Sequence, residues 1–426
     1  MTRPPVVTGI GVVAPNGLGS VDYWSATCAG ISGIRAVERF DAQGYASVLA
    51  GEVREKDFKA EERLPGRLLA QTDHMTRLAL VAANWALEDA KVEGSTRDAL
   101  DRGVITASSA GGFEFGQREL QNLWRMGNEY VSAYQSFAWF YAVNTGQISI
   151  RHGLKGPSGV VVTDQAGGLD AIAQARRQLR RGSKLILCGG VDGSICPWGW
   201  IAQMAGGRVS HSDDPAAAYL PFDDRAAGHV SAEGGAILVL EDAQAAEDRG
   251  APKVYGEIAG YAATFDPQPG TGREPALKRA IVGALADAGV AHDEVDVVFA
   301  DAAAVPSMDQ IEADAIAAVF GVRAVLVTAP KSMTGRMYAG AAALDVAAAL
   351  LAIRDGLIPP TINVRPARRY PVEVVTALRG PMLVQVAVVI ARGQGGFNSV
   401  LVVRGPRGNA GRKRETREAR YVRQDI

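Results

Sequence analysis

Short apolar runs alternate with amphipathic segments along almost the whole chain. The first part holds VVTGIGVV, VITA, VVVT, KLILCGG and GGAILVLE, and the second holds VYGEIAGYAATF, VDVVFAD, VLVTAP, VQVAVVIA and SVLVVRG. Such runs, rich in β-branched residues, are typical of strands. Between them lie segments with helical spacing, such as residues 73–90, where Met75, Leu78, Ala82 and Trp85 share one face.

This alternation predicts an α/β fold whose parallel or mixed sheets are covered by helices on both faces. The polar segment 242–253 predicts a helical turn and a connector, after which the pattern restarts. We therefore expect two similar halves, residues 1–250 and 251–405, although the letters show no clean repeat. Residues 406–426 predict a basic, mobile tail, with contact to a partner or nucleic acid as the alternative.

Composition narrows the class of protein. A formal net charge of −1 argues against nucleic acid or an acidic membrane as a partner. The three cysteines are odd in number and lack metal-ligand spacing, which favours a reducing cytoplasm over secretion. No signal peptide and no bilayer-spanning segment is recognisable. We expect a soluble, cytoplasmic protein.

Two patterns point only weakly to a cofactor or a metal. TGIGVVAPNG contains G-x-G-x-x-A, but the acidic residue that a dinucleotide-binding fold has about 20 positions later is missing. The five histidines show no metal-ligand spacing. We therefore expect no cofactor and no metal site.

The segment VVTDQAGGLDAIAQARR (161–177) predicts a strand, a tight turn and a helix, with Gln165 at the junction. The β-branched residues 160–163 favour a buried strand. A helix N-terminus would make a thiol at this junction acidic and nucleophilic. A carboxamide only exchanges hydrogen bonds, so on the residues alone Gln165 could simply stabilise a turn.

Four segments, in the right order, resemble the β-ketoacyl synthases. The junction around Gln165 resembles their nucleophile region, and residues 221–242 resemble their PFD-x-x-R-x-G strand region. Residues 331–345 resemble their K-S-x-x-G-H segment, and residues 395–399 their glycine-rich loop near the C-terminus. The resemblance implies a thiolase-like α/β fold, with duplicated halves that form a five-layered α-β-α-β-α architecture.

The residues that carry the chemistry of that family are mostly replaced. Gln165 stands in place of the Cys, Asp301 in place of the His of A-H-G-T, and Arg336 in place of the His of K-S-x-x-G-H. Only Lys331 is kept. Condensation needs a thiolate to carry the acyl chain and imidazoles to stabilise the enolate and the oxyanion. We therefore expect no catalytic residue and no enzyme activity from this chain alone.

Gln at this junction, together with DPAAAYLPFDDRAAGHV, QSFAWFYAVNTGQISIRHG and PWGW, is similar to the chain length factors. These are the ketosynthase-like β subunits of bacterial type II aromatic polyketide synthases. The resemblance implies a heterodimer with a catalytic ketosynthase α subunit, which extends a poly-β-ketone chain with malonyl units from an acyl carrier protein. The amide of Gln165 would then stabilise the turn or the complex.

The resemblance also implies a tunnel between the subunits whose depth limits the length of the polyketide. Residues 107–124 look like the helix that lines it, with Phe113, Gly116 and Leu120 on one stripe. An ordinary core-facing stripe is the alternative. Because glycine has no side chain, we expect a roomy tunnel and a product of about ten rather than about eight ketide units.

Two aromatic segments complete the expected site. Trp198, in a turn formed by PWGW, would close another wall of the tunnel or only pack that turn. Phe137, Trp139 and Phe140 are expected at the subunit interface, with burial in the core as the alternative.

Two other functions stay open. Ketosynthase-like domains with Gln in place of Cys can decarboxylate a malonyl group and leave an acetyl starter on the carrier protein. That activity relies on the histidines that Asp301 and Arg336 replace here. Alternatively, the chain is a purely structural partner that stabilises the ketosynthase without setting chain length.

Overall fold

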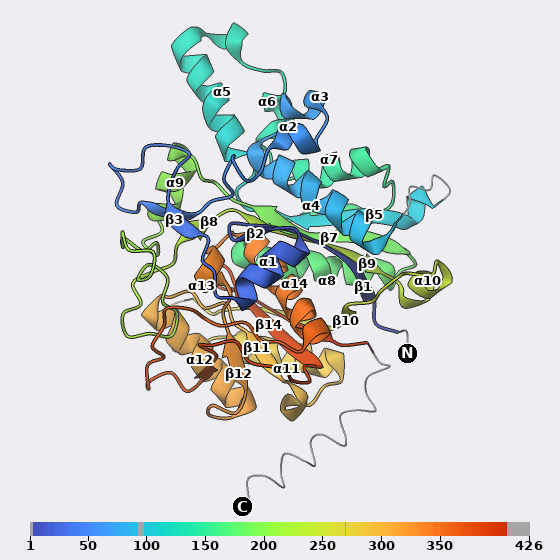
Figure 1. Cartoon of the computed structure of the whole chain (residues 1–426), viewed down its shortest axis with the longest axis vertical. Helices are drawn as coiled ribbons and strands as arrows, with labels where there is room; N and C mark the ends of the chain where they lie inside the picture. The colour runs from blue at the N-terminus through green and yellow to red at the C-terminus, as the bar shows by residue number, and fades with distance from the viewer. Residues whose placement is uncertain (1–2, 93–97, 269, 407–426) are drawn as a thin grey trace, which may run out of the picture.

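The strands of the two halves form the same pattern in the computed structural model, which describes residues 3–92, 98–268 and 270–406 (Figure 1). The spatial order is β6-β5-β7-β9-β1 in the first half and β12-β11-β14-β15-β10 in the second. Taken in this order, the first three strands of each half run parallel to one another. The fourth strand is antiparallel to the third, and the fifth is antiparallel to the fourth. The chain is therefore a structural duplication, which the letters alone do not reveal. The bounds are β1 (Val6–Ala14), β5 (Arg102–Ala107), β6 (Ser158–Val161), β7 (Leu185–Asp192), β9 (Gly234–Glu241), β10 (Gly256–Phe265), β11 (Val297–Phe299), β12 (Leu326–Thr328), β14 (Val386–Arg392) and β15 (Phe397–Arg404).

The two halves are joined through β1 and β10, which pair antiparallel with Val6 opposite Glu257. Short strands complete the sheets: β2 (Gly17–Leu18) and β13 (Glu373–Val374) extend the large one, while β3 (Ile34–Ala36), β4 (Leu49–Gly51) and β8 (Ser231–Ala232) form a small one. The expected division at residue 250 falls in the connection between β9 and β10 and stays a prediction. Of the expected tail, only Pro406 lies within the described residues.

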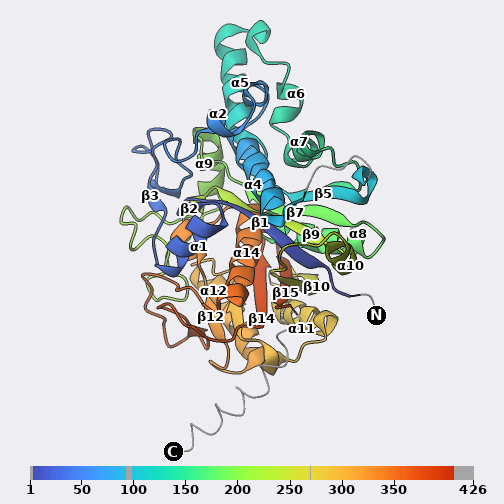
Figure 2. The same cartoon turned by 45° about the vertical axis from the view of Figure 1, so that its right-hand side comes forward.

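Helices form three layers around the two halves of the sheet, so the expected five-layered architecture is confirmed (Figures 1 and 2). The central layer consists of α8 and α14, which pack on each other and on strands of both halves. Two helices cover each outer face. The bounds are α8 (Gly167–Leu179) and α14 (Ala339–Asp355) in the centre, α4 (His74–Ala90) and α7 (Val143–His152) on one side, and α11 (Leu277–Ala288) and α12 (Pro306–Phe320) on the other.

The central layer is possible because its helices carry small side chains. Helix α14 has the sequence AGAAALDVAAALLAIRD, and its residues are buried from Ala339 to Ile353. A helix that is apolar on all sides belongs in a core. A Cβ on Gly340 would lie only 2.1 Å from the carbonyl oxygen of Gly234, so the helix approaches the sheet as closely as glycine allows.

One helix leaves this body. Helix α5 (Phe113–Met126) projects beyond the layers at the top of Figures 1 and 2, next to α6 (Gln135–Ala138). The remaining helices are α1 (Ser20–Cys28), α2 (Ala60–Arg63), α3 (Gly66–Leu69), α9 (Pro197–Met204), α10 (Ala243–Asp248) and α13 (Lys331–Thr334), with 3₁₀ turns η1 (Ala99–Asp101), η2 (Asn128–Tyr130), η3 (Asp164–Ala166) and η4 (His292–Glu294). None of the helices in the described ranges is long and apolar enough to cross a membrane.

The expectation of a buried strand at residues 160–163 is wrong in part. Strand β6 ends at Val161, because residues 164–166 already form η3. Its valines are only half-buried, and Val162 is 46% exposed. The physical reason is its place in the sheet: β6 lies at the edge, where the pattern of β-branched residues cannot distinguish a free edge from a covered one.

Candidate functional site

The turn after β6 places Gln165 at the start of α8, with only 7% of the residue exposed. The preceding Asp164 has φ 51°, a left-handed conformation that is uncommon for residues with side chains. Its carboxylate accepts a hydrogen bond from the backbone N–H of Gln394, at 2.6 Å. This bond holds the start of the glycine-rich C-terminal loop against the turn.

The carboxamide of Gln165 is complementary to the backbone of Tyr338. In the amide orientation that suits both groups, its nitrogen donates to the Tyr338 carbonyl at 3.0 Å and its oxygen accepts from the Tyr338 N–H at 3.2 Å. Tyr338 immediately precedes α14 and has φ 45°, again left-handed. Neither a thiolate nor a carboxylate can both donate and accept in this way.

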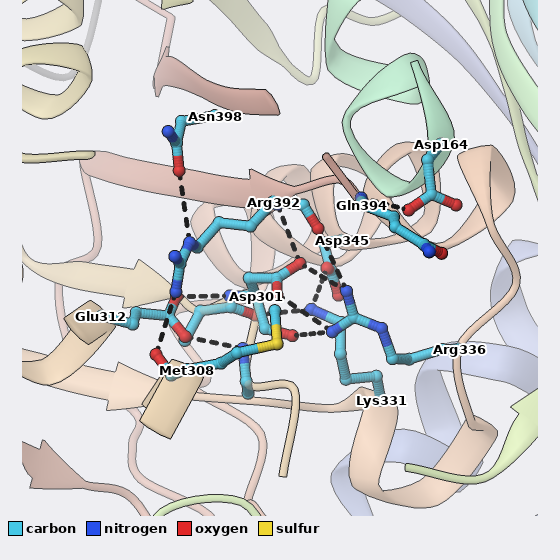
Figure 3. Close-up of polar contacts among 12 residues, drawn as sticks. Asp164, Asp301, Met308, Glu312, Lys331, Arg336, Asp345, Arg392, Gln394 and Asn398 are labelled. Carbon is cyan, nitrogen blue, oxygen red and sulfur yellow. Dashed lines mark hydrogen bonds and ion pairs between the residues drawn. The ribbon is translucent and has the colours of Figure 1, made fainter. Parts of the chain in front are cut away.

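Asp301 and Arg336 form a buried ion pair, and each residue is no more than 4% exposed (Figure 3). The guanidinium contacts both carboxylate oxygens, at 3.0 and 3.1 Å, and also donates to the Asp301 backbone carbonyl at 2.9 Å. Burial alone would raise the pKa of Asp301, but the positive charge of Arg336 holds it below its usual value. Arg336 also donates to the Arg392 carbonyl at 3.3 Å, so most of its hydrogen bonds go to Asp301, whose carboxylate balances its charge.

Lys331 is paired with an acidic residue in the same manner. The ammonium of Lys331 donates to Asp345 at 2.6 Å and to the backbone carbonyl of Ala300. Burial raises the pKa of Asp345, and the ammonium of Lys331 opposes that rise. Glu312 accepts the backbone N–H of Asp301 at 2.7 Å, so a second carboxylate fixes the loop after β11. Figure 3 shows these contacts as one continuous cluster.

A cavity of about 280 Å³ lies beside Gln165. Arg336, Tyr338 and His229 also line it, whereas Asp301 and Lys331 do not. Among the described residues in this lining there is no Cys, Ser, Thr or Lys, hence none of the usual nucleophiles of acyl transfer. Burial lowers the pKa of His229 to about 3, so its imidazole is neutral near pH 7.

His229 and Tyr338 belong to the site, although the sequence pattern did not single them out. His229 appeared only as one of five histidines without ligand spacing, and its Nδ1 has no hydrogen-bond partner within the described part of the chain. Tyr338 contacts Gln165 through its backbone, and the amino-acid sequence gives no indication of such a contact.

The expected tunnel residues meet in an aromatic wall, defined here as Phe113, Gly116, Trp139 and Trp198. The rings of Phe113 and Trp198 have centroids 4.7 Å apart. A methyl group on the buried Gly116 would lie 3.5 Å from Trp139 Cβ and 3.6 Å from Trp198 Cζ3. Leu120 lies one turn further along α5 and is half-buried. Trp139, expected at the subunit interface, therefore forms part of the same wall.

The expectation that PWGW forms a turn is wrong. Pro197 is the first residue of helix α9, where its fixed φ suits a helix and its missing N–H costs nothing. The side-chain oxygen of Gln117 on α5 accepts the backbone N–H of Trp198 at 2.6 Å. The wall is therefore built from two helices tied to each other.

The projecting part of the molecule carries an unusual number of exposed apolar side chains. Trp139 is 47% and Phe140 38% exposed, so these two are not core residues, while Phe137 is half-buried. We define the apolar face by the large exposed side chains on and around α5, α6 and α7: Leu123, Trp124, Met126, Tyr130, Tyr134, Trp139, Phe140, Tyr141 and Ile150.

Comparisons with known proteins agree with this geometry. The model of the β-ketoacyl synthase N-terminal domain matches residues 2–246, and that of the C-terminal domain matches residues 255–365. The chain is 59% identical over 403 residues to the tetracenomycin polyketide synthase ketoacyl synthase beta subunit of Streptomyces glaucescens, covering 94% of this chain and 98% of that protein.

Two solved structures share the fold along nearly the whole chain. One is the ishigamide ketosynthase/chain length factor, and the other is a type II polyketide synthase acyl carrier protein in complex with its ketosynthase bound to the hexaketide. In each case the TM-score is 0.83 and the sequence identity 28%, over 95% of this chain and 100% of that chain. The chain belongs to the β-ketoacyl synthase family and, within it, to the ketosynthase β subunits, or chain length factors, of type II polyketide synthases.

Proposed function

We propose that this chain is a non-nucleophilic subunit that pairs with a catalytic ketosynthase and sets the length of an aromatic polyketide by shaping a tunnel at their interface. The observation that carries the proposal is the aromatic wall. A glycine with no side chain lies between two tryptophans, on a helix that projects from the body. The bulk at residue 116 would decide how far a growing poly-β-ketone chain can extend.

Two features explain why this chain would have no activity without its partner: the glutamine at residue 165 and the ion pair of Arg336 with Asp301. Acyl transfer needs a nucleophile and a group that stabilises negative charge on oxygen. Gln165 cannot form a thioester, and the donors of Arg336 are held by Asp301. The partner would supply the Cys, the histidines and the docking of a malonyl-loaded acyl carrier protein.

Two features support a protein partner. The apolar face includes Trp124, which is 77% exposed, and Tyr130, which is 55% exposed, and large exposed patches of this kind mark interaction sites. Among the described strands, β6 pairs with β5 only. Its sequence, SGVV, contains neither the charges nor the proline that normally protect a free edge. A strand of the partner could therefore pair with β6.

A second candidate function rests on one observation. The neutral imidazole of His229 lines the cavity beside Gln165, while its Nδ1 is buried and has no partner among the described residues. An imidazole N–H turned to the cavity could donate a hydrogen bond to the thioester oxygen while the malonyl carboxylate leaves as CO₂. The enolate that remains would take up a proton from water and give an acetyl starter. Arg336, paired with Asp301, offers little further help, so we rank this activity second.

Replacing Gln165 with Ala tests its structural role. Gln165→Ala removes both hydrogen bonds to Tyr338 and should destabilise the chain by about 1–3 kcal/mol, because the Tyr338 N–H loses its acceptor and the carbonyl keeps only the 3.3 Å bond from Ala341. Thermal unfolding measures the effect. Gln394→Ala is the control, since Gln394 lines the same cavity but has no side-chain hydrogen bond within the described residues. Equal melting temperatures for both variants and the parent chain would contradict the role.

Adding bulk at residue 116 tests the length-setting wall. Gly116→Ala should be tolerated, because its methyl group would be in ordinary contact with both tryptophans. Gly116→Phe would push a ring outward from between the tryptophans and should shorten the main product by at least one two-carbon unit, as read by mass spectrometry of the reconstituted complex. Gly44→Phe, at an exposed position with open space around it, is the control. A Gly116→Phe complex that makes the parental product would exclude residue 116 from the gate.

A charge beside β6 tests the interface. Val162→Asp should lower the affinity for the ketosynthase partner at least about tenfold, because an unpaired carboxylate would be buried. Val322→Asp, at a position 71% exposed and beyond the end of α12, should leave the affinity unchanged. Isothermal titration or co-elution measures both. Unimpaired binding by the Val162 variant would place the partner elsewhere.

A further inference from the structure

We propose that Asp73 is a positioning residue that orients α5 and thereby fixes the length to which the polyketide grows. This inference rests on the proposed function, because it assumes that the aromatic wall limits the product. Asp73 would act only through the helix that carries Phe113 and Gly116.

One carboxylate caps two helices. An oxygen of Asp73 accepts the backbone N–H of Met75 at 2.8 Å, which makes Asp73 the N-cap of α4. Its other oxygen accepts the backbone N–H of Phe115 at 2.8 Å, in the first turn of α5. The N-cap position of α5 is Gly112, which has no side chain to serve that purpose. Asp73 thus supplies to α5 the cap that its own sequence lacks.

The surroundings make this contact strong. Asp73 is only 4% exposed. Burial raises the pKa of its carboxyl group, while the hydrogen bonds from Phe115 and Met75 oppose that rise. The partial positive charge at the N-termini of both helices also favours the carboxylate. Because this carboxylate is buried, water cannot readily replace it as the acceptor for the N–H groups of the two helices. The two helices are therefore held at a fixed angle.

The hydrogen bond from Phe115 to Asp73 joins the packed helix α4 to the projecting helix α5. Helix α4 packs on β1 and β9, and its residues from Leu78 to Ala83 are all buried. Helix α5 has 14 residues, most of its outer half exposed. At about 1.5 Å per residue it extends for roughly 20 Å from its base. A small change of angle at Phe115 therefore shifts Leu120 and the residues beyond it, while at the base it alters the contact of Gly116 with the two tryptophans.

The bond also lies beside the glycine of the wall, because Gly116 is the next residue after Phe115. Other contacts of the α5 base tie parts of the wall to one another: Gly112 N–H donates to the Trp139 carbonyl at 2.9 Å, and Gln117 holds Trp198. Within the described residues, the first turn of α5 is also held by the buried side chain of Phe115 and by the ion pair of Glu114 with Arg39, which at 3.7 Å is longer and partly exposed. Loosening Asp73 should therefore let the wall move as a unit.

Asp73→Ser separates the two caps. Serine is a good N-cap and keeps the cap of α4, but it has a single, shorter oxygen and leaves the N–H of Phe115 unpaired. We expect the variant to fold and to bind the ketosynthase. The ratio of off-length to main product should rise about fivefold, the change that one lost hydrogen bond produces in a two-state population. Asp73→Asn, which keeps the shape but only one acceptor, should act in the same direction.

The readout is the product-length ratio from equal amounts of intact complex, which a merely structural role would leave unchanged. Asp242→Ser is the matched control, because Asp242 caps α10 through the N–H groups of Gln244 and Ala245, far from α5 in Figure 1. Gly116→Phe is measured in parallel.

Broadened products from both Asp73 variants, with the Asp242 variant unchanged, support the inference. A parental ratio from the Asp73 variants, while Gly116→Phe shortens the product, overturns the inference and leaves the proposed function standing. If Gly116→Phe also yields the parental product, both are overturned.

Discussion

The requirement that buried charges be paired determines what the centre of this chain can be. Arg336 and Asp301 are almost fully buried and satisfy each other through several contacts, and Lys331 with Asp345 forms a second pair. Removing one member of such a pair strands the other charge in the core and costs several kcal/mol. Asp301 and Arg336 therefore act as one unit. Together they form a buried pair whose charges cancel.

The features that suit a partner protein lie at the surface of the molecule. The free edge of β6, the apolar face around α5 and the aromatic wall all belong to the first half of the duplication. The second half repeats the strand order but has no counterpart to α5 at the equivalent place among its described residues, between β11 and α12. The asymmetry between two equivalent halves supports the view that α5 is where this chain carries out its task.

The sequence predicted the parts that depend on local patterns. Strands appeared as β-branched runs and α4 by its spacing, and the replaced catalytic positions were identified through the family resemblance. Contacts between distant segments could not be predicted: Gln165 and Tyr338 are brought together only by the packing of α8 on α14. PWGW was mistaken for a turn, because Pro and Gly favour turns in general, whereas Pro at the first position of a helix is equally favourable. Asp73 shows the same limit, since helical spacing locates the segment that it begins, whereas its contact with Phe115 arises only in the fold.

The most direct test of the account is mass spectrometry of the products formed from malonyl-loaded acyl carrier protein. The protein is incubated alone, the ketosynthase partner is incubated alone, and the two are then incubated together. The account predicts no new acyl species with this chain alone, and one discrete long polyketide with the pair. Acetyl-carrier protein formed by this chain alone, or the same product from the ketosynthase with and without it, would contradict a non-catalytic subunit that sets chain length.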